Sequence, residues 1–343
     1  MRIAVIGGGG WGLALARILA LNDHQVLIWE FNAQWLKTLQ ETHANPALLP
    51  NITLPHSVQF TGSFEELAAW EAEVIVLATP TQFIRSTLES IPPHLQERIW
   101  LSESLQAIVN VAKGIEQNTL LRIDQILMEV LPPAAHHLIC ALSGPSHAEE
   151  VSREIPTTVV VAGHSQERLI MLQQLFSNSW FRVYRTEDLI GVEIGGAVKN
   201  VIAIAAGILA GLGFGDNSMG ALLTRGIVEI SRLGLAQGAR TETFLGLSGI
   251  GDLITTSISP NSRNRHVGVQ IGKGRKLADI LSEMKMVAEG VASTRSVYEL
   301  AQRYKVEMPI TQEVYYILFE DKDPHQAIYE LMTRELKEEA VGL

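Results

Sequence analysis

The 343-residue sequence predicts two domains: an N-terminal α/β domain with a doubly wound parallel sheet, and an all-α C-terminal domain. Short apolar runs alternate with helical patterns up to about residue 188, which is typical of βαβ units. Beyond that point the strand-like runs disappear, and long helical patterns rich in Gly, Ala and Ile continue to the C-terminus. We therefore expect the domains to span residues 1–188 and 189–343.

The elements of the N-terminal domain follow from these apolar runs. A helical pattern comes directly after the first run, and another lies near residues 166–176. The run at 74–78 is apolar throughout, so we expect a buried strand there. The runs expected to form strands cover residues 3–7, 25–29, 74–78, 99–101, 108–112, 138–142, 158–162 and 181–184.

The composition excludes several classes of protein. Apolar residues make up 47% of the chain and charged residues 19%, as in a globular protein without long disordered tracts. The net charge of −10 disfavours nucleic acids and anionic membranes, so an anionic ligand needs a local cluster of bases. The single cysteine, Cys140, predicts a buried thiol and a reducing, most simply cytoplasmic, compartment. We expect no metal site, and no signal peptide, because the first apolar run continues into glycines.

One apolar stretch, residues 192–212, is long enough to be mistaken for a membrane span. It contains Lys199 and Asn200, and a lysine at the centre of a bilayer costs about 2.5–3.5 kcal/mol on insertion scales. We therefore expect a buried helix of a globular domain.

A glycine-rich turn follows the first strand. Gly7, Gly9 and Gly12 form a G-x-G-x-x-G pattern between a strand-like run and a helical pattern, and Glu30 ends the second run 18 residues past Gly12. This context predicts a Rossmann-like dinucleotide-binding domain with the pyrophosphate at the N-terminus of the helix. The alternatives are a turn without a ligand, or a turn that binds FAD or S-adenosylmethionine.

Lys199 lies on a helical face made of small residues. Its neighbours at helical spacing are Gly195, Gly196, Ala203, Ala206 and Gly207, whereas the opposite face is rich in Ile and Val. Two interpretations remain open. The small face leaves a cavity into which the cation projects, or it packs on another helix while Lys199 extends to solvent.

A basic segment precedes a later helical pattern. Ser262, Arg263, Asn264 and Arg265 combine two guanidinium groups with polar side chains near a helix start, which favours phosphate binding. A solvated basic loop is the alternative.

Three further positions stand at the ends of expected elements. Gly144 and Ser146 follow the strand at 138–142, and Ser146 with Glu149 also fits a capping box. Lys113 follows the strand at 108–112, where ligands of doubly wound sheets bind. Asp252 fits the cap of a helix as well as a ligand contact.

Taken in order along nearly the whole chain, these motifs resemble the bacterial NAD(P)-dependent glycerol-3-phosphate dehydrogenases. The lysine block and the SRNR block together are specific to that family. The matching blocks are GGGGWG (7–12), VAKGIE (111–116), LSGPSHAEE (142–150), IGGAVKNVIAIAAG (194–207), GFGDNSMGALLTRG (213–226), FLGLSGIGDL (244–253), SRNRHVG (262–268), VAEG (287–290) and VEMPIT (306–311).

The resemblance implies roles for individual residues. Lys199 matches the proton donor and acceptor of the family, and Lys113 matches a residue that touches both substrate and coenzyme. The remaining substrate contacts it implies are Gly144, Ser146, Asp252, Ser262, Arg263 and Asn264. The coenzyme contacts it implies, beyond the three glycines of the turn, are Gly10, Trp11, Phe31, Ala148, Arg263, Val287 and Glu289.

The sequence departs from the pattern of the family at four positions. Gly10 stands where Ser is common, so a contact there must come from the backbone, and Ser146 replaces Thr but keeps the hydroxyl. Phe31 stands near the position where a basic or polar residue often faces the adenosine ribose. His266 replaces an Arg, which weakens the basic cluster near neutral pH.

The resemblance implies hydride transfer between NAD or NADP and the couple of dihydroxyacetone phosphate and glycerol 3-phosphate, which supplies glycerophospholipid synthesis. We expect a preference for NAD. Glu30 can accept hydrogen bonds from ribose hydroxyls and repel a 2′-phosphate, and no base follows before Lys37. Alternatively, Glu30 points to solvent and does not discriminate between NAD and NADP.

The alternative functions are another two-domain dehydrogenase, of 2-hydroxyacid, ketopantoate or opine type, and a coenzyme sensor without turnover. The sequence leaves a monomer and a homodimer open.

Overall fold

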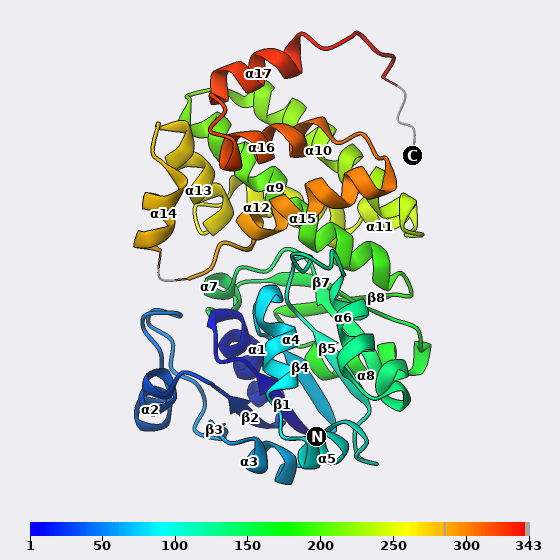
Figure 1. Cartoon of the computed structure of the whole chain (residues 1–343). Coiled ribbons are helices and arrows are strands. Elements are labelled where there is room, and N and C mark those ends of the chain that lie inside the picture. The colour runs from blue at the N-terminus through cyan, green and yellow to red at the C-terminus, as the bar shows by residue number, and fades with distance from the viewer. Residues whose placement is uncertain (285, 340–343) are drawn as a thin grey trace. The chain divides into compact units, whose positions relative to one another are not determined.

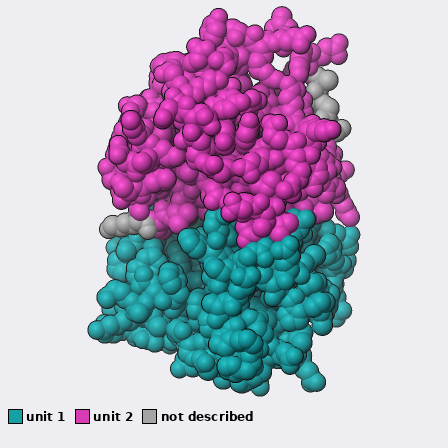
Figure 2. All heavy atoms as spheres, viewed as in Figure 1, with its two compact units in different colours: residues 1–112, 123–189 teal, residues 113–122, 190–343 magenta. Residues whose placement is uncertain are grey.

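The computed structural model describes residues 1–284 and 286–339. The chain divides into two compact units, which are coloured separately in Figure 2. The first contains residues 1–112 and 123–189, and the second contains residues 113–122 and 190–343. The expected boundary at 188/189 lies one residue from the break at 189/190. The sequence did not indicate that the short segment 113–122, which begins with Lys113, joins the helical unit.

The first unit is built on one eight-stranded sheet, most of whose strands are labelled in Figure 1. The spatial order is β3-β2-β1-β4-β5-β6-β7-β8, and neighbouring strands are parallel except for the antiparallel pair β6 and β7. The strands are β1 (Arg2–Ile6), β2 (Gln25–Trp29), β3 (Val58–Thr61), β4 (Val74–Leu77), β5 (Ala107–Asn110), β6 (Ile139–Ser143), β7 (Thr157–Gly163) and β8 (Phe181–Thr186).

Helices cover both faces of this sheet. The four residues Ile3 to Ile6 of β1 have no exposed surface, as expected for a central strand of a doubly wound sheet. The strand order reverses between β1 and β4, so the carboxyl ends of these two strands form the switch point at which such sheets bind ligands. The helices are α1 (Gly10–Leu21), α2 (Ala33–Thr42), α3 (Phe64–Ala69), α4 (Thr81–Glu89), α5 (Pro93–Trp100), α6 (Ile123–Val130), the 3₁₀ helix η1 (Pro133–Leu138), α7 (Ala148–Val151) and α8 (Gln166–Phe176).

The sheet corrects three sequence expectations. Residues 99–101 are not a strand: Ile99 and Trp100 end α5, where Ile99 and Leu95 face the core one helical turn apart. An apolar run of three residues cannot distinguish a strand from the buried side of a helix. The strand β3 went unnoticed because it alternates between buried and more exposed residues and is short. The sheet is mixed and not all parallel, since β7 returns antiparallel to β6.

In the second unit every regular element among the described residues is a helix. The helix α9 (Leu189–Gly211) meets the length and composition of a membrane span, but 83% of its most apolar window is buried inside the protein. It therefore fits the expectation of a buried core helix. The others are α10 (Asp216–Ala236), α11 (Thr241–Phe244), the π-helical turn η2 (Leu247–Gly251), α12 (Asp252–Ile258), α13 (Arg263–Gly272), α14 (Leu277–Glu283), α15 (Glu289–Tyr304), α16 (Pro309–Phe319) and α17 (Pro324–Met332).

The small face of α9 packs against α13 with the two backbones in contact. Gly207 and Gly211 of α9 face Gly268 and Gly272 of α13. A Cβ atom on Gly207 would lie 2.1 Å from the carbonyl oxygen of Arg265, and one on Gly268 would lie 2.9 Å from the Cα of Gly207. This part of the small face therefore serves close helix packing and not a cavity. It fixes the position of α13, whose N-terminus carries the SRNR segment.

Candidate active site

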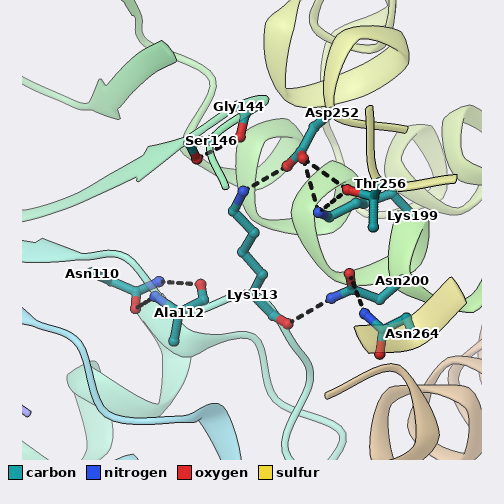
Figure 3. Close-up of polar contacts among 10 residues, drawn as sticks. All are labelled: Asn110, Ala112, Lys113, Gly144, Ser146, Lys199, Asn200, Asp252, Thr256 and Asn264. Carbon is teal, nitrogen blue, oxygen red and sulfur yellow. Dashed lines mark hydrogen bonds and ion pairs between the residues drawn. The ribbon is translucent and has the colours of Figure 1, made fainter. Parts of the chain in front are cut away.

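Two lysines and an aspartate form a buried ion cluster within the helical unit (Figure 3). The Nζ of Lys199, on α9, donates to Oδ1 of Asp252 at 2.8 Å and to Oγ1 of Thr256 at 2.6 Å. The Nζ of Lys113 donates to the other carboxylate oxygen, Oδ2, of Asp252 at 2.7 Å. One carboxylate at the start of α12 therefore holds two ammonium groups from segments that are distant in sequence.

The cluster is almost fully removed from water. Lys199 is 5% exposed and Asp252 is 1% exposed. Lys199 therefore does not extend to solvent, so the second interpretation is correct for the packing of the small face and wrong for the lysine. Gly195 of α9 makes room for the segment before α12, since a Cβ atom there would lie 2.4 Å from the carbonyl oxygen of Ser248. The small face thus brings the backbone of η2 close enough for Asp252 to reach Lys199.

Burial and neighbouring charges set the pKa values of this cluster. Loss of solvent, together with the positive charge of Lys113, lowers the pKa of Lys199 to about 8, although the negative charge of Asp252 opposes the shift. Burial alone raises the pKa of Asp252, but the two lysines outweigh it and hold that pKa below its ordinary value. Lys199 therefore lies in the range in which an amine can both donate and accept a proton near neutral pH.

A chain of amide hydrogen bonds connects the cluster to α13 and α15. The Nδ2 of Asn200 donates to the carbonyl oxygen of Lys113 at 3.2 Å, and the Nδ2 of Asn264 donates to Oδ1 of Asn200 at 2.9 Å. The backbone N–H of Gly290, in the first turn of α15, donates to Oδ1 of Asn264 at 2.9 Å. The side chain of Asn264 is thus committed to holding these helices together.

The N-terminus of α13 combines a capping serine with an exposed arginine. The hydroxyl of Ser262 accepts from the backbone N–H of Arg265 at 3.2 Å, so Ser262 is the N-cap that the sequence placed near a helix start. Arg263 is exposed and donates from its guanidinium to the carbonyl oxygen of Val287 at 2.7 Å. Glu289, the first residue of α15, follows two residues later. This terminus offers a guanidinium and first-turn N–H groups to an anion.

The glycine turn of the first unit has the three distinct environments that dinucleotide binding requires. Gly7 has φ = 115°, and a Cβ atom there would lie 2.9 Å from the backbone of Ala78. A Cβ atom on Gly12 would lie 2.1 Å from the carbonyl oxygen of Gly7, so this glycine permits close contact between helix and turn. Gly9, the N-cap of α1, has no atom within 4 Å of a Cβ position. Open space at the second glycine is where the pyrophosphate approaches in this motif.

Other predicted coenzyme residues of the first unit gather around the start of α1. A Cβ atom on Gly10 would lie 3.0 Å from the carbonyl oxygen of Leu48 and 4.0 Å from the Cβ of Ala148. The Nε1 of Trp11 is buried and has no hydrogen-bond partner among the described residues. A larger residue at position 10 would therefore press on Leu48, which fits the glycine found here.

The segment after β6 differs from one sequence expectation. Ser146 does not form a capping box with Glu149: the N-cap of α7 is His147, and the hydroxyl of Ser146 donates to the carbonyl oxygen of Gly144 at 2.9 Å. Gly144 has φ = 132° and ends β6 in a turn that a side chain would strain. The hydroxyl therefore stabilises the turn, so helix initiation is not its function.

Glu30 lies beneath the glycine turn, at the carboxyl end of β2. It is 3% exposed, so it does not point to solvent. Its Oε2 accepts from the backbone N–H of Gly8 at 2.9 Å, and its Oε1 accepts from that of Asn32 at 2.7 Å. Burial raises the pKa of Glu30, while the N–H groups oppose this shift. The next residue, Phe31, is 77% exposed.

The predicted residues thus form one group within each unit. Those of the helical unit are linked by hydrogen bonds through Asn200 and Thr256, two residues that the sequence did not mark as part of a site. The spacing of Thr256 from Asp252, one helical turn, was the available signal. Among the described residues, no group of three or more His, Cys, Asp or Glu side chains could hold a metal ion.

These two groups define a class of protein. The first unit has a doubly wound sheet with a G-x-G-x-x-G turn at its switch point, and the helical unit carries a buried lysine. This combination is typical of two-domain nicotinamide-dependent dehydrogenases.

Comparison with known proteins identifies the family. The N-terminal profile of NAD-dependent glycerol-3-phosphate dehydrogenase matches residues 2–169, and the C-terminal profile matches residues 188–329. The chain belongs to this family, as the resemblance implied.

Individual relatives agree with this assignment. The chain is 48% identical over 338 residues to glycerol-3-phosphate dehydrogenase [NAD(P)+] of Geobacter sulfurreducens, covering 98% of each protein. It is 48% identical over 342 residues to the enzyme of that name from Chlorobium luteolum, covering 99% of each. The crystal structure of glycerol-3-phosphate dehydrogenase from Coxiella burnetii matches with 33% identity and a TM-score of 0.89, covering 97% of this chain and 99% of that one.

More distant structures share the fold alone. A D-mandelate dehydrogenase with NADH matches with 13% identity and a TM-score of 0.57, covering 94% of this chain and 98% of that one. The alternative dehydrogenase classes thus have the same architecture but not the sequence of this family.

Proposed function

We propose that this chain catalyses the reversible NAD(P)-dependent interconversion of dihydroxyacetone phosphate and sn-glycerol 3-phosphate. The observation that carries the proposal is the buried Lys199, held by Asp252 within a chain of this family. The family identification supports the choice of substrate, and the motif at α13 supports its phosphate group.

Lys199 supplies the proton chemistry. When bound, the nicotinamide coenzyme gives or takes the hydride at C2 of the substrate. The Lys199 ammonium donates a proton to the carbonyl oxygen as negative charge develops there, and in the reverse direction the amine accepts a proton from the hydroxyl. Asp252 and Thr256 fix the direction of Nζ, and Lys113 adds positive charge that favours release of the proton.

The N-terminus of α13 binds the phosphate in this proposal. Arg263 is exposed there and supplies a guanidinium. The side chains of Ser262 and Asn264 already serve capping and helix contacts, so the further contribution of this terminus comes through the backbone N–H groups of the first turn, which begins at Arg263. Gly144 and Ser146 remain proposed substrate residues of the first unit.

The glycine turn binds the coenzyme pyrophosphate at the N-terminus of α1, and we propose that NAD is preferred over NADP. Two observations support the preference. The exposed position after the end of β2 is occupied by Phe31 and not by a base, and no base follows before Lys37, whose side chain is 69% exposed and 3.9 Å from Glu41. Trp11, Ala148, Val287 and Glu289 remain proposed coenzyme contacts.

In the cell we propose a cytoplasmic enzyme that supplies glycerol 3-phosphate to glycerophospholipid synthesis, either as a monomer or as a homodimer. The family assignment and the absence of a cysteine pair support this placement.

The decisive assay is the loss of NADH absorbance with dihydroxyacetone phosphate, compared with pyruvate, ketopantoate and buffer alone. We expect turnover with dihydroxyacetone phosphate only. Turnover with a keto acid would assign the chain to another dehydrogenase class. Coenzyme binding without any turnover would favour the sensor.

A further inference from the structure

A buried carboxylate, Glu30, lies beneath the dinucleotide turn and has no ion-pair partner among the described residues. Each oxygen of Glu30 accepts a backbone N–H, one from Gly8 in the turn and one from Asn32 before α2. The backbone N–H of Glu30 itself donates to the carbonyl oxygen of Thr61 at 2.9 Å. The carboxylate therefore connects the end of β2 to the turn above β1 and to the start of the next helix.

Gly8 is the partner of this carboxylate. A Cβ atom on Gly8 would lie 2.6 Å from Oε2 of Glu30, closer than such atoms approach. Gly8 is not one of the glycines with positive φ, in contrast to Gly7, so its backbone conformation is open to alanine. The obstacle to a side chain at position 8 is the carboxylate and not the backbone.

We infer that Glu30 and Gly8 form a matched pair in which the Glu30 carboxylate positions the coenzyme-binding turn from beneath. This inference rests on the proposed function, because it assumes that the turn binds the coenzyme. Gly8 lies between Gly7, which makes the turn, and Gly9, which opens space for the pyrophosphate. Fixing the N–H of Gly8 fixes the path of the backbone through both neighbours.

The chemistry of the carboxylate distinguishes positioning from direct contact with the ribose. Both oxygens face N–H donors, and only a carboxylate offers an acceptor at each position. In Glu30→Gln, one of the two donors faces an amide NH₂ group, so the turn loses a hydrogen bond. A carboxylate that acted by touching the ribose would instead repel the 2′-phosphate of NADP, and Glu30→Gln would improve NADPH binding.

The test is a double-mutant cycle between the two positions, read out as the dissociation constants of NADH and NADPH from coenzyme fluorescence. The variants are Gly8→Ala, Glu30→Ala, their combination and Glu30→Gln. We expect Gly8→Ala to weaken both coenzymes by about tenfold or more in the wild-type background, since it breaks a charge-assisted hydrogen bond. In the Glu30→Ala background, Gly8→Ala should change the two dissociation constants less than about twofold. The nearest remaining atom to the new Cβ, the Cβ of residue 30, is then 3.4 Å away.

Glu30→Gln should weaken NADH and NADPH by similar factors. The matched control is Glu73→Gln, since Glu73 also accepts a backbone N–H of β1, that of Arg2 at 2.7 Å, but at the opposite end of the strand. It should lower thermal stability without changing either dissociation constant. This control separates positioning of the turn from general support of the sheet.

Three results would overturn the inference: additive effects of Gly8→Ala and Glu30→Ala, tighter NADPH binding by Glu30→Gln, or equal coenzyme loss in Glu73→Gln. Failure of the proposed function looks different, because the wild-type protein would then bind neither coenzyme. Thermal midpoints of all variants show which ones fold. If Gly8→Ala does not fold, its folding in combination with Glu30→Ala still supports the pair, and failure of both refutes it.

Discussion

The glycine turn and the lysine cluster present opposite kinds of chemical groups. Around the turn, the groups placed for a ligand are backbone N–H groups and open space at Gly9, and the one buried carboxylate, Glu30, contacts only the backbone. In the lysine cluster the contacts are between charged side chains, and Asp252 lies between two ammonium groups. The contrast appears in the two carboxylates, because burial raises the pKa of Glu30 while the lysines lower that of Asp252.

This difference indicates where single substitutions should matter most. A backbone site is insensitive to most side-chain changes, whereas removal of one charge from a buried cluster removes a chemical step or leaves a charge unpaired. We therefore expect the largest effects in the helical unit and the smallest at the coenzyme ribose.

Lys199→Met should cause the largest loss. Turnover should fall by roughly 10²–10⁴, the usual contribution of one general acid, because methionine keeps the length of the side chain but has no proton to give. The coenzyme dissociation constant should stay within about twofold of wild type. Steady-state kinetics and fluorescence titration check both statements, and near-normal turnover would remove Lys199 from the mechanism.

Arg263→Ala should raise the KM for dihydroxyacetone phosphate by about tenfold or more, since a hydrogen bond to a charged group contributes about 1.5–3 kcal/mol. The control is the substrate without phosphate, dihydroxyacetone, whose slow reduction should barely change. An equal loss with both substrates would show that Arg263 serves the coenzyme or the fold.

The pH dependence should report the pKa of Lys199, about 8. Reduction requires the ammonium form, so kcat/KM should be level below that pH and fall about tenfold per unit above it. Oxidation of glycerol 3-phosphate requires the amine, so its kcat/KM should rise up to the same pH and then level off. Measurements of kcat/KM against pH in both directions check the assignment. If kcat/KM changed with pH in the same direction for reduction and for oxidation, the assignment would be wrong.

The titration of Lys199 does not itself destabilise the fold over this pH range. The folded pKa of Lys199 lies below its ordinary value of 10.5, so between pH 8 and 10.5 the unfolded chain binds more protons. The contribution of Lys199 to the free energy of unfolding therefore rises with pH across that window. Denaturant titrations at two pH values in that range separate the two effects.

Gly268→Ala tests whether backbone contact also matters in the helical unit. The new Cβ would lie 2.0 Å from the carbonyl oxygen of Ile204, so α13 must move away from α9. We expect about 1–3 kcal/mol of destabilisation from overpacking and a severalfold rise in the KM for dihydroxyacetone phosphate, with kcat less affected.

The matched control for this variant is Gly220→Ala in α10, where a Cβ atom has no neighbour within 4 Å. It should stabilise the protein by up to about 1 kcal/mol through helix propensity. An unchanged KM in a folded Gly268→Ala variant would show that the position of α13 does not limit phosphate binding.

The same contrast explains how much the sequence could predict. The turn consists of residues close in sequence whose spacing is dictated by backbone geometry, so Gly7, Gly9 and Gly12 were identified with their correct context. The lysine cluster draws on segments around 113, 199 and 252, and no local pattern shows that one carboxylate holds both lysines.

The sequence pattern also could not predict burial at two positions. The glycines of α9 predicted either a cavity or a helix contact, and both the packing on α13 and the burial of Lys199 depend on elements distant in sequence. Glu30 ended a strand in the manner of a ribose-binding acid, but the missing side chain at Gly8 allows its carboxylate to turn beneath the loop.

The smallest effect concerns the choice of coenzyme. We expect the wild type to prefer NADH over NADPH by at least severalfold in kcat/KM, because the described residues of β2 and of the first turn of α2 include no cation that could pair with a 2′-phosphate. Phe31→Arg should shift the ratio toward NADPH, since position 31 is 77% exposed and a guanidinium there can pair with the phosphate. Phe31→Gln is the control for loss of the ring without added charge. Both coenzymes must be measured at one ionic strength, because salt screens the charge interactions of the 2′-phosphate. A wild-type preference for NADPH would mean that a base distant in sequence neutralises the phosphate. Coenzyme choice at the glycine turn would then depend on the charge of a side chain and not on the backbone alone.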